Sequence, residues 1–84
     1  MNIREELAAT FPEVVLLEPA KFDAAILGVT ERCGEETTVC YDLEKVLKIL
    51  VADGMSYDEA VEYYEYNIVG AYMGEHTPTF LNAL

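Results

Sequence analysis

The stretch that decides the fold spans residues 54–80 and reads GMSYDEAVEYYEYNIVGAYMGEHTPTF. Ser56 followed three residues later by Glu59 is the capping-box pattern with which helices begin. Apolar and aromatic residues then recur at helical spacing, and they define an inner face made of Tyr57, Ala60, Val61, Tyr64 and Ile68. Tyr63 and Tyr66 fall outside this face, on the side that carries the acidic residues. The stretch therefore predicts an amphipathic helix with tyrosines exposed among carboxylates.

Two interpretations are open for the end of this helix. Gly70 indicates that the helix stops before it, because glycine is a poor helix former. Residues 68–72 then suit a short third strand, while the alternative is that residues 67–72 continue the helix. In both cases residues 73–79 predict a loop, after which Phe80 and Leu81 fold back onto the core.

The residues just before this stretch predict a second helix. Asp42 has the chemistry of an N-cap, and Gly54 that of a left-handed stop at the end of the helix. The apolar stripe between them consists of Leu43, Val46, Leu47, Leu50 and Val51. Two consecutive helices are therefore expected in the C-terminal half.

A β-hairpin is expected before the two helices. Residues 24–32 and 37–41 are rich in strand-forming residues, and the turn of residues 33–36 joins them as antiparallel neighbours. In the first strand, Ala25, Leu27 and Val29 are expected to share one face. Gly28 within the same strand indicates a bulge or a close approach by another backbone.

The N-terminal quarter predicts three short pieces. Asn2 and Glu5 form a helix-cap pattern, and Pro12 ends the short helix that it begins. Residues 14–17 predict a strand, and residues 19–23 a turn or a single helical turn. The whole chain predicts one α+β domain, residues 1–84, with a short N-terminal helix, a small antiparallel sheet built on a hairpin, and two consecutive helices packed on one face.

Charge is the main clue to partners. The formal net charge is −11, and all five Lys and Arg residues lie at or before Lys48. Such acidity disfavours nucleic acid and anionic membranes as direct partners. Plain solubility, a basic protein partner and mimicry of a nucleic-acid backbone are the three interpretations that it leaves open.

The chemistry of the side chains favours binding over catalysis. The first residues lack the apolar core and cleavage site of a signal peptide, so an intracellular protein with Cys33 and Cys40 reduced is expected. His76 is the single histidine, and no nucleophile elbow, phosphate loop or metal-ligand spacing accompanies it. We therefore expect no enzymatic activity, no cofactor and no metal.

The loop from Gly70 to Pro78 is the candidate ligand site. Glycines let the backbone approach a ligand, tyrosine rings can stack on one, and an arginine can neutralise a phosphate. The expected ligand-binding residues are Tyr66, Gly70, Tyr72, Gly74, Glu75, His76 and Thr77, with Arg32 as the first candidate for the cation and Lys21 or Arg4 as alternatives. The alternative is a tight turn that closes the core. Separately, Tyr63 and Tyr66 are expected at an interface, and a chain this small and apolar is expected to form a homo-oligomer.

Residues 22–81 resemble a family of small, mostly uncharacterised proteins encoded by bacteriophages and prophages. The resemblance is carried by residues 22–28, 39–42, 53–60 and 67–72, together with Gly74-Glu75 and Thr77-Pro78. It implies a counter-defence role in the cytoplasm of a host bacterium. Some such proteins resemble acidic decoys that occupy nucleic-acid sites on nucleases, and others resemble oligomers that sequester nucleotide-derived immune signals.

Two functions follow as hypotheses. The first is a non-enzymatic binding protein that sequesters a small nucleotide-derived immune signal in an oligomer. The second is an acidic, nucleic-acid-mimicking inhibitor that binds a basic groove on a host defence protein or nuclease. A virion or assembly component is a third, structural alternative.

Overall fold

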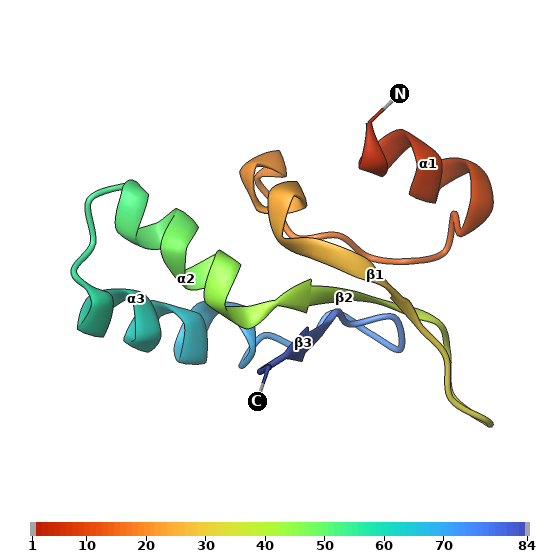
Figure 1. Ribbon diagram of the computed structural model, residues 1–84. Helices are drawn as coiled ribbons and strands as arrows, with labels where there is room; N and C mark the ends of the chain where they lie inside the picture. The colour runs from red at the N-terminus through yellow and green to blue at the C-terminus, as the bar shows by residue number, and fades with distance from the viewer. Residues whose placement is uncertain (1, 84) are drawn as a thin grey trace.

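The expected β-hairpin lies at the centre of the protein. A computed structural model describes residues 2–83. In it β1 (Ile26–Thr30) pairs antiparallel with β2 (Thr38–Asp42), as predicted (Figure 1). The register shifts between Ile26 and Gly28, so the expected bulge is present. Because the bulge adds a residue, Ile26 and Val29 both pack against the core while Leu27 is half exposed, and the simple alternation expected for this strand is wrong.

The third strand is not where the sequence suggested. β3 (Thr79–Leu81) pairs with β2 in parallel, which gives the order β1-β2-β3. The sheet is therefore mixed, not wholly antiparallel as expected. A parallel pair needs a long crossover, and residues 43–78 supply it through the two helices.

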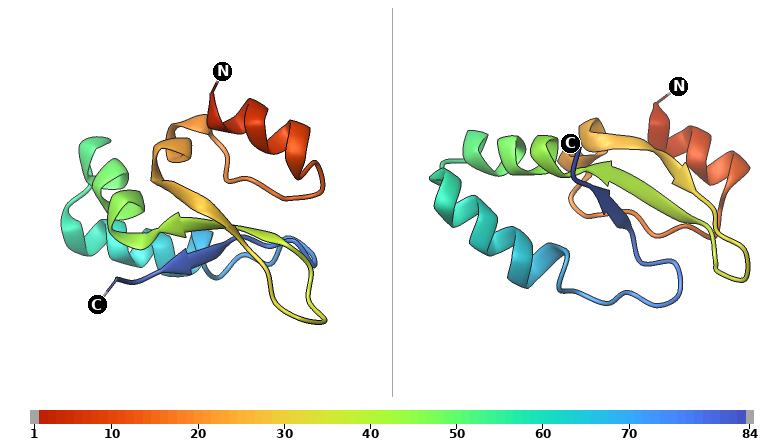
Figure 2. Two further views of the ribbon diagram at one scale, coloured as in Figure 1. Left: turned by 45° about the vertical axis from the view of Figure 1, so that its right-hand side comes forward. Right: turned by 60° about the horizontal axis from the view of Figure 1, so that its bottom comes forward.

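The two consecutive helices form as predicted. α2 (Leu43–Ala52) begins at Asp42, whose side chain accepts a hydrogen bond from the Glu44 N–H. Gly54 follows its end with φ of 110°, a conformation that suits glycine. α3 (Tyr57–Tyr63) begins with the Ser56–Glu59 capping box, in which both reciprocal hydrogen bonds are present. The α2–α3 pair and α1 lie at opposite ends of the sheet (Figures 1 and 2).

α3 continues without a break into a π-helical turn, η2 (Tyr64–Ile68). The wide turn is closed by the Val69 N–H, which donates to the Tyr64 carbonyl at 2.8 Å. Of the two interpretations for residues 67–72, the helical one therefore holds as far as Ile68, and the strand is wrong.

The N-terminal segment packs over the core without joining the sheet. α1 (Ile3–Thr10) has Asn2 as its N-cap, and η1 (Ala20–Ala25) is a short 3-10 helix, which agrees with the helical one of the two predictions for residues 19–23. The strand predicted for residues 14–17 is wrong. The backbone there pairs with no strand, and the Leu17 N–H donates instead to the Tyr41 hydroxyl at 2.8 Å.

One core joins the sheet to the helices. Val39 and Tyr41 of β2 are fully buried, and Phe80 of β3 lies between the rings of Tyr41 and Tyr64, with centroids 5.8 and 5.3 Å away. Phe80 thus folds back onto the core as expected. Tyr57 was expected to face inward but is 55% exposed, because the first turn of α3 lies at the end of the helix pair far from the sheet (Figure 1). Within residues 2–83, no helix has the length and apolar character needed to cross a bilayer.

Candidate functional site

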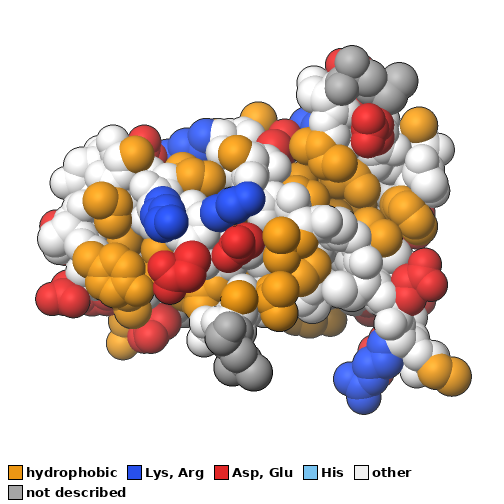
Figure 3. Space-filling model, in the orientation of Figure 1, with side chains coloured by type: hydrophobic (Ala, Val, Ile, Leu, Met, Phe, Trp, Pro, Cys, Tyr) orange, Lys and Arg blue, Asp and Glu red, His pale blue; other side chains and the backbone are white. Residues whose placement is uncertain are grey.

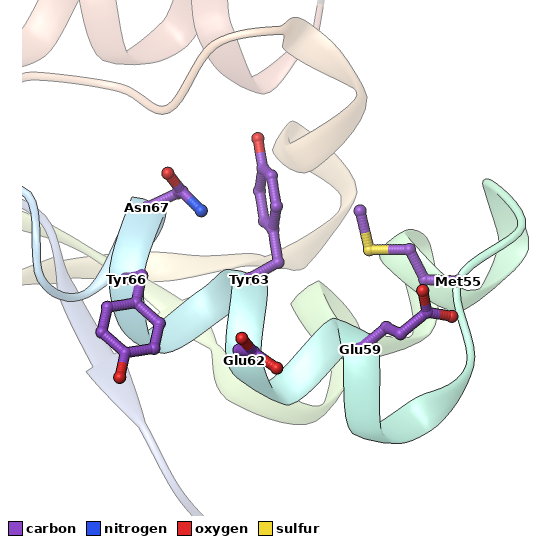
Figure 4. A pocket seen from close by; sticks show the side chains of 6 residues that line it. All are labelled: Met55, Glu59, Glu62, Tyr63, Tyr66 and Asn67. Carbon is purple, nitrogen blue, oxygen red and sulfur yellow. The ribbon is translucent and has the colours of Figure 1, made fainter.

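A groove of about 430 Å³ runs along the outer face of α3 and η2 (Figure 4). We call it the α3 groove. Its lining residues are Met55, Glu59, Glu62, Tyr63, Tyr66 and Asn67. Five of the six recur at helical spacing, from residue 59 to residue 67, so they form one face of the continuous helix. Met55, from the loop before α3, closes one end.

The α3 groove contains both tyrosines expected at an interface. The residue exposures of Tyr63 and Tyr66 are 40% and 76%. Figure 4 shows their side chains projecting from the same helix, with Glu62 next to Tyr63. Sequence reasoning missed Met55, Glu59, Glu62 and Asn67 as parts of the site. The signal was present for three of them, because Glu59, Glu62 and Asn67 repeat with the tyrosines at helical spacing, away from the buried residues of the same helix.

The charged residues that line the α3 groove are both acidic. Glu59 accepts a hydrogen bond from the Ser56 N–H at 2.9 Å, and this bond, together with one to the Ser56 side chain, lowers the pKa of its carboxyl. The residues lining the groove, all in the described part of the chain, include Glu62 as a second acid and no Lys or Arg. A cation or a cationic side chain that enters the groove is therefore attracted by two carboxylates and repelled by no positive charge.

The loop predicted as a ligand site lines a second, smaller hollow of about 310 Å³. We call it the hairpin hollow. Tyr72, Gly74, Glu75 and Thr77 come from the loop, and Gly34, Glu35 and Glu36 from the turn between β1 and β2. Tyr72 is 81% exposed, so its ring is free to stack on a ligand. The three carboxylates in this small space would repel a phosphate group.

Two of the predicted ligand residues instead hold the loop in place. His76 Nδ1 lies 2.8 Å from the Thr37 carbonyl, to which it can only donate, and its Nε2 lies 3.6 Å from Glu36. The Thr77 hydroxyl accepts from the Met73 N–H at 2.8 Å and donates to the Gly74 carbonyl at 2.5 Å. The His76 contacts attach the loop to the hairpin and the Thr77 bonds close the loop on itself, in the manner of the alternative interpretation of this loop as a closing turn.

Gly70 has a structural role at the end of η2. A Cβ built there would lie 2.5 Å from the Glu65 carbonyl oxygen, so only glycine fits the wide turn without a shift of the backbone. This close approach is to the protein's own helix.

Arg32 lies in a further hollow of about 510 Å³ beside the sheet. Its neighbours there include four glutamates and a threonine from each strand, and the remaining lining residues are Thr30, Glu31, Glu35, Glu36, Thr38, Glu75 and Thr79. Seven of the eight predicted ligand residues thus divide among the α3 groove, the end of η2, the hairpin hollow and this hollow, while His76 lines none of the three hollows and contacts the hairpin. The structure does not bring Tyr66 and Arg32 to the hollow that Tyr72 lines.

Cys33 is exposed, Cys40 is half-buried, and both are free thiols. Within residues 2–83, no three His, Cys, Asp or Glu side chains are grouped so that they could hold a metal ion.

No protein-family model matches this chain, and no curated protein or solved structure matches it.

Proposed function

We propose that this protein is a non-enzymatic binding protein whose α3 groove receives a basic segment of a partner protein. The observation that carries the proposal is the composition of one helix face. Tyr63 and Tyr66 stand there beside Glu59 and Glu62, and no basic residue lines the groove. Tyrosine is enriched at interfaces, and its amphipathic ring contributes much contact area at low entropic cost.

The chemistry of the α3 groove suits lysine and arginine. Each has a long aliphatic stem that packs on an aromatic ring, and a charged head that pairs with a carboxylate. A cation held over a tyrosine ring gains about 0.5–1 kcal/mol at an exposed site. The net charge of −11 would also steer a basic partner toward the protein and speed the encounter.

A host defence protein in the bacterial cytoplasm is the partner that we favour. Surfaces that bind nucleic acid are basic, so an acidic helix face can occupy one in place of a phosphate backbone. The resemblance of residues 22–81 to small phage-encoded proteins supports this context. The function is then that of an acidic inhibitor that blocks a basic groove.

The test uses a fluorescent helical peptide rich in Lys and Arg, and compares two double variants by anisotropy. Glu62→Gln with Tyr66→Ala changes the α3 groove. Glu65→Gln with Tyr57→Ala makes the same chemical changes on the same helix, outside the groove. We expect the first variant to bind at least about tenfold more weakly and the second to bind like the wild type.

Equal weakening by both double variants would contradict the proposal, because it would mean that the peptide responds to overall charge. Circular dichroism of both variants supplies the control for folding.

A small nucleotide-derived ligand in the hairpin hollow is the second candidate. The exposed Tyr72 ring and the open space beside Gly74 favour it. Its three glutamates disfavour phosphates, which is why we rank it lower. Calorimetric titration with cyclic dinucleotides and ADP-ribose derivatives tests it. Binding that Tyr72→Ala abolishes without unfolding would support it, and an absence of heat with the wild type would remove it.

A further inference from the structure

α2 presents a small basic surface to solvent. Lys45 and Lys48 are exposed and three residues apart, and Val51, one further turn along, is 40% exposed. Residues at this spacing lie on one side of a helix. We call these three residues the lysine face. Figure 3 shows two basic side chains next to each other over α2.

The other cations are placed differently. Arg4 pairs with Glu18 and Asp23 at 3.0 and 2.8 Å, and Lys21 pairs with Asp53. Arg32 lies among glutamates beside the sheet. Within residues 2–83, Lys45 and Lys48 take part in no ion pair, so the two cations of the lysine face have no carboxylate partner in their own copy.

We propose that the lysine face of one copy docks in the α3 groove of a second copy. The two surfaces match in charge and in spacing. Lys45 and Lys48 are three residues apart, and so are Glu59 and Glu62, so two packed helices can place both lysines near both carboxylates. Tyr63 and Tyr66 then cover Val51 and the lysine stems.

The match also answers how a chain with a net charge of −11 can associate with itself. At about 0.1 M salt the Debye length is about 10 Å, so repulsion between distant charges is screened while ion pairs in contact persist. At about 1 M salt it is about 3 Å, and these pairs also weaken. Self-association is therefore expected at moderate salt and lost at high salt.

The proposed contact joins two different surfaces, so it is heterologous. Such contacts close into rings or extend as chains, and one pair of copies leaves a free lysine face and a free α3 groove. The groove is the one proposed above for a basic partner, so self-association and partner binding exclude each other. A second copy occupies the groove until a more basic partner displaces it.

The test uses two half-blocked variants in sedimentation velocity at about 0.1 M salt. Lys45→Gln with Lys48→Gln removes the lysine face and keeps the α3 groove. Glu62→Gln with Tyr66→Ala removes the groove and keeps the lysine face. We expect the wild type to assemble, each variant alone to remain monomeric, and an equimolar mixture to form a one-to-one dimer that grows no further. Glu65→Gln with Tyr57→Ala is the control and should assemble like the wild type.

Three results would overturn the proposal: a wild type that stays monomeric at high concentration, half-blocked variants that assemble alone, or a mixture that stays monomeric. The single changes Lys48→Gln and Glu62→Gln serve if a double variant fails to fold. The Lys45→Gln, Lys48→Gln protein keeps its groove, so its binding of the basic peptide separates failure of this inference from failure of the proposed function.

Discussion

At the scale of single residues, one hydrogen bond explains why the segment before η1 is not a strand. The Tyr41 hydroxyl accepts from the Leu17 N–H inside the core, and burial raises the pKa of the phenol, which therefore stays neutral. The Tyr41 side chain thus supplies the hydrogen-bond acceptor that a neighbouring strand would otherwise supply to the Leu17 N–H. A buried N–H that loses its partner costs about 1–3 kcal/mol.

The Tyr41→Phe variant tests this role. It keeps the ring stacked on Phe80 but removes the acceptor of the Leu17 N–H, so we expect a loss of about 1–3 kcal/mol in unfolding free energy. Chemical denaturation measures it. Tyr64→Phe is the matched control, because the Tyr64 hydroxyl bonds nothing within the described residues, and its change should stay within about 0.5 kcal/mol. Equal losses would show that the hydrogen bond does not matter.

Glu59 makes the start of α3 sensitive to acid. Its folded-state pKa lies below the ordinary value of 4.5 because the Ser56 N–H and the Ser56 side chain bond the carboxyl. A lowered pKa stabilises the fold above the ordinary value, and this stability is lost as pH falls through the folded pKa. We expect Glu59→Gln to be less stable than the wild type near neutral pH, with the difference shrinking as pH falls below 4.5 and through the lowered pKa of Glu59.

Denaturation series at several pH values measure this difference. Glu65→Gln, a change on the same helix outside the capping box, controls for the loss of one charge. A Glu59→Gln difference that stays constant with pH would contradict the assigned role of the cap.

At the scale of elements, the π turn η2 gives α3 its shape and its end. π turns are rare and are found frequently at functional sites. Here the turn carries Tyr66 and Asn67 on the outside and Tyr64 and Ile68 inside. Gly70 makes it possible, since a side chain at that position would press on the Glu65 carbonyl.

For Gly70→Ala, helix propensity and the close contact at Gly70 predict changes of opposite sign in the free energy of unfolding. Helix propensity alone would make alanine more stable by about 0.5–1 kcal/mol. The 2.5 Å approach to a backbone oxygen predicts instead a loss of about 1–3 kcal/mol, the usual cost of overpacking. Thermal and chemical denaturation decide between them, and a stabilised variant would contradict the role given to the π turn.

The elements predicted correctly from the sequence are those fixed by local contacts. The caps at Asn2, Asp42 and Ser56 each involve residues two or three apart, so their pattern is legible in the chain itself. β3 was missed because its partner β2 is distant in the sequence. It was also missed because a segment of three residues directly after Pro78 is too short to show the alternating pattern of a strand. Its place depends on Phe80 packing between two aromatic rings of other elements.

The residues of the candidate site also separate into those that the local sequence pattern predicts and those that depend on contacts visible only in the structure. Tyr63 and Tyr66 could be predicted as exposed because helical periodicity places them opposite the buried face. Gly70 was misread as a ligand residue because the contact that requires glycine exists only in a π turn, which periodicity does not reveal. The partners of His76 lie near residue 37, so its role in holding the loop also could not be predicted.

At the scale of the whole molecule, charge is distributed unevenly between helices. The chain beyond Lys48 carries acids and no Lys or Arg, so α3 and η2 are acidic while α2 has the lysine face. The three hollows described above all contain carboxylates. A basic partner is therefore better matched to this surface than an anionic one, whichever hollow it uses.

The most direct test of this account is to map where a Lys- and Arg-rich peptide binds, using two-dimensional ¹H–¹⁵N NMR of the Lys45→Gln, Lys48→Gln protein, whose α3 groove is intact and not filled by a second copy, at about 0.1 M salt. We predict that the shifted amides cluster between residues 59 and 67, along the α3 groove. Shifts confined to residues 34–36 and 72–77, or spread evenly over all the acidic residues, would contradict it.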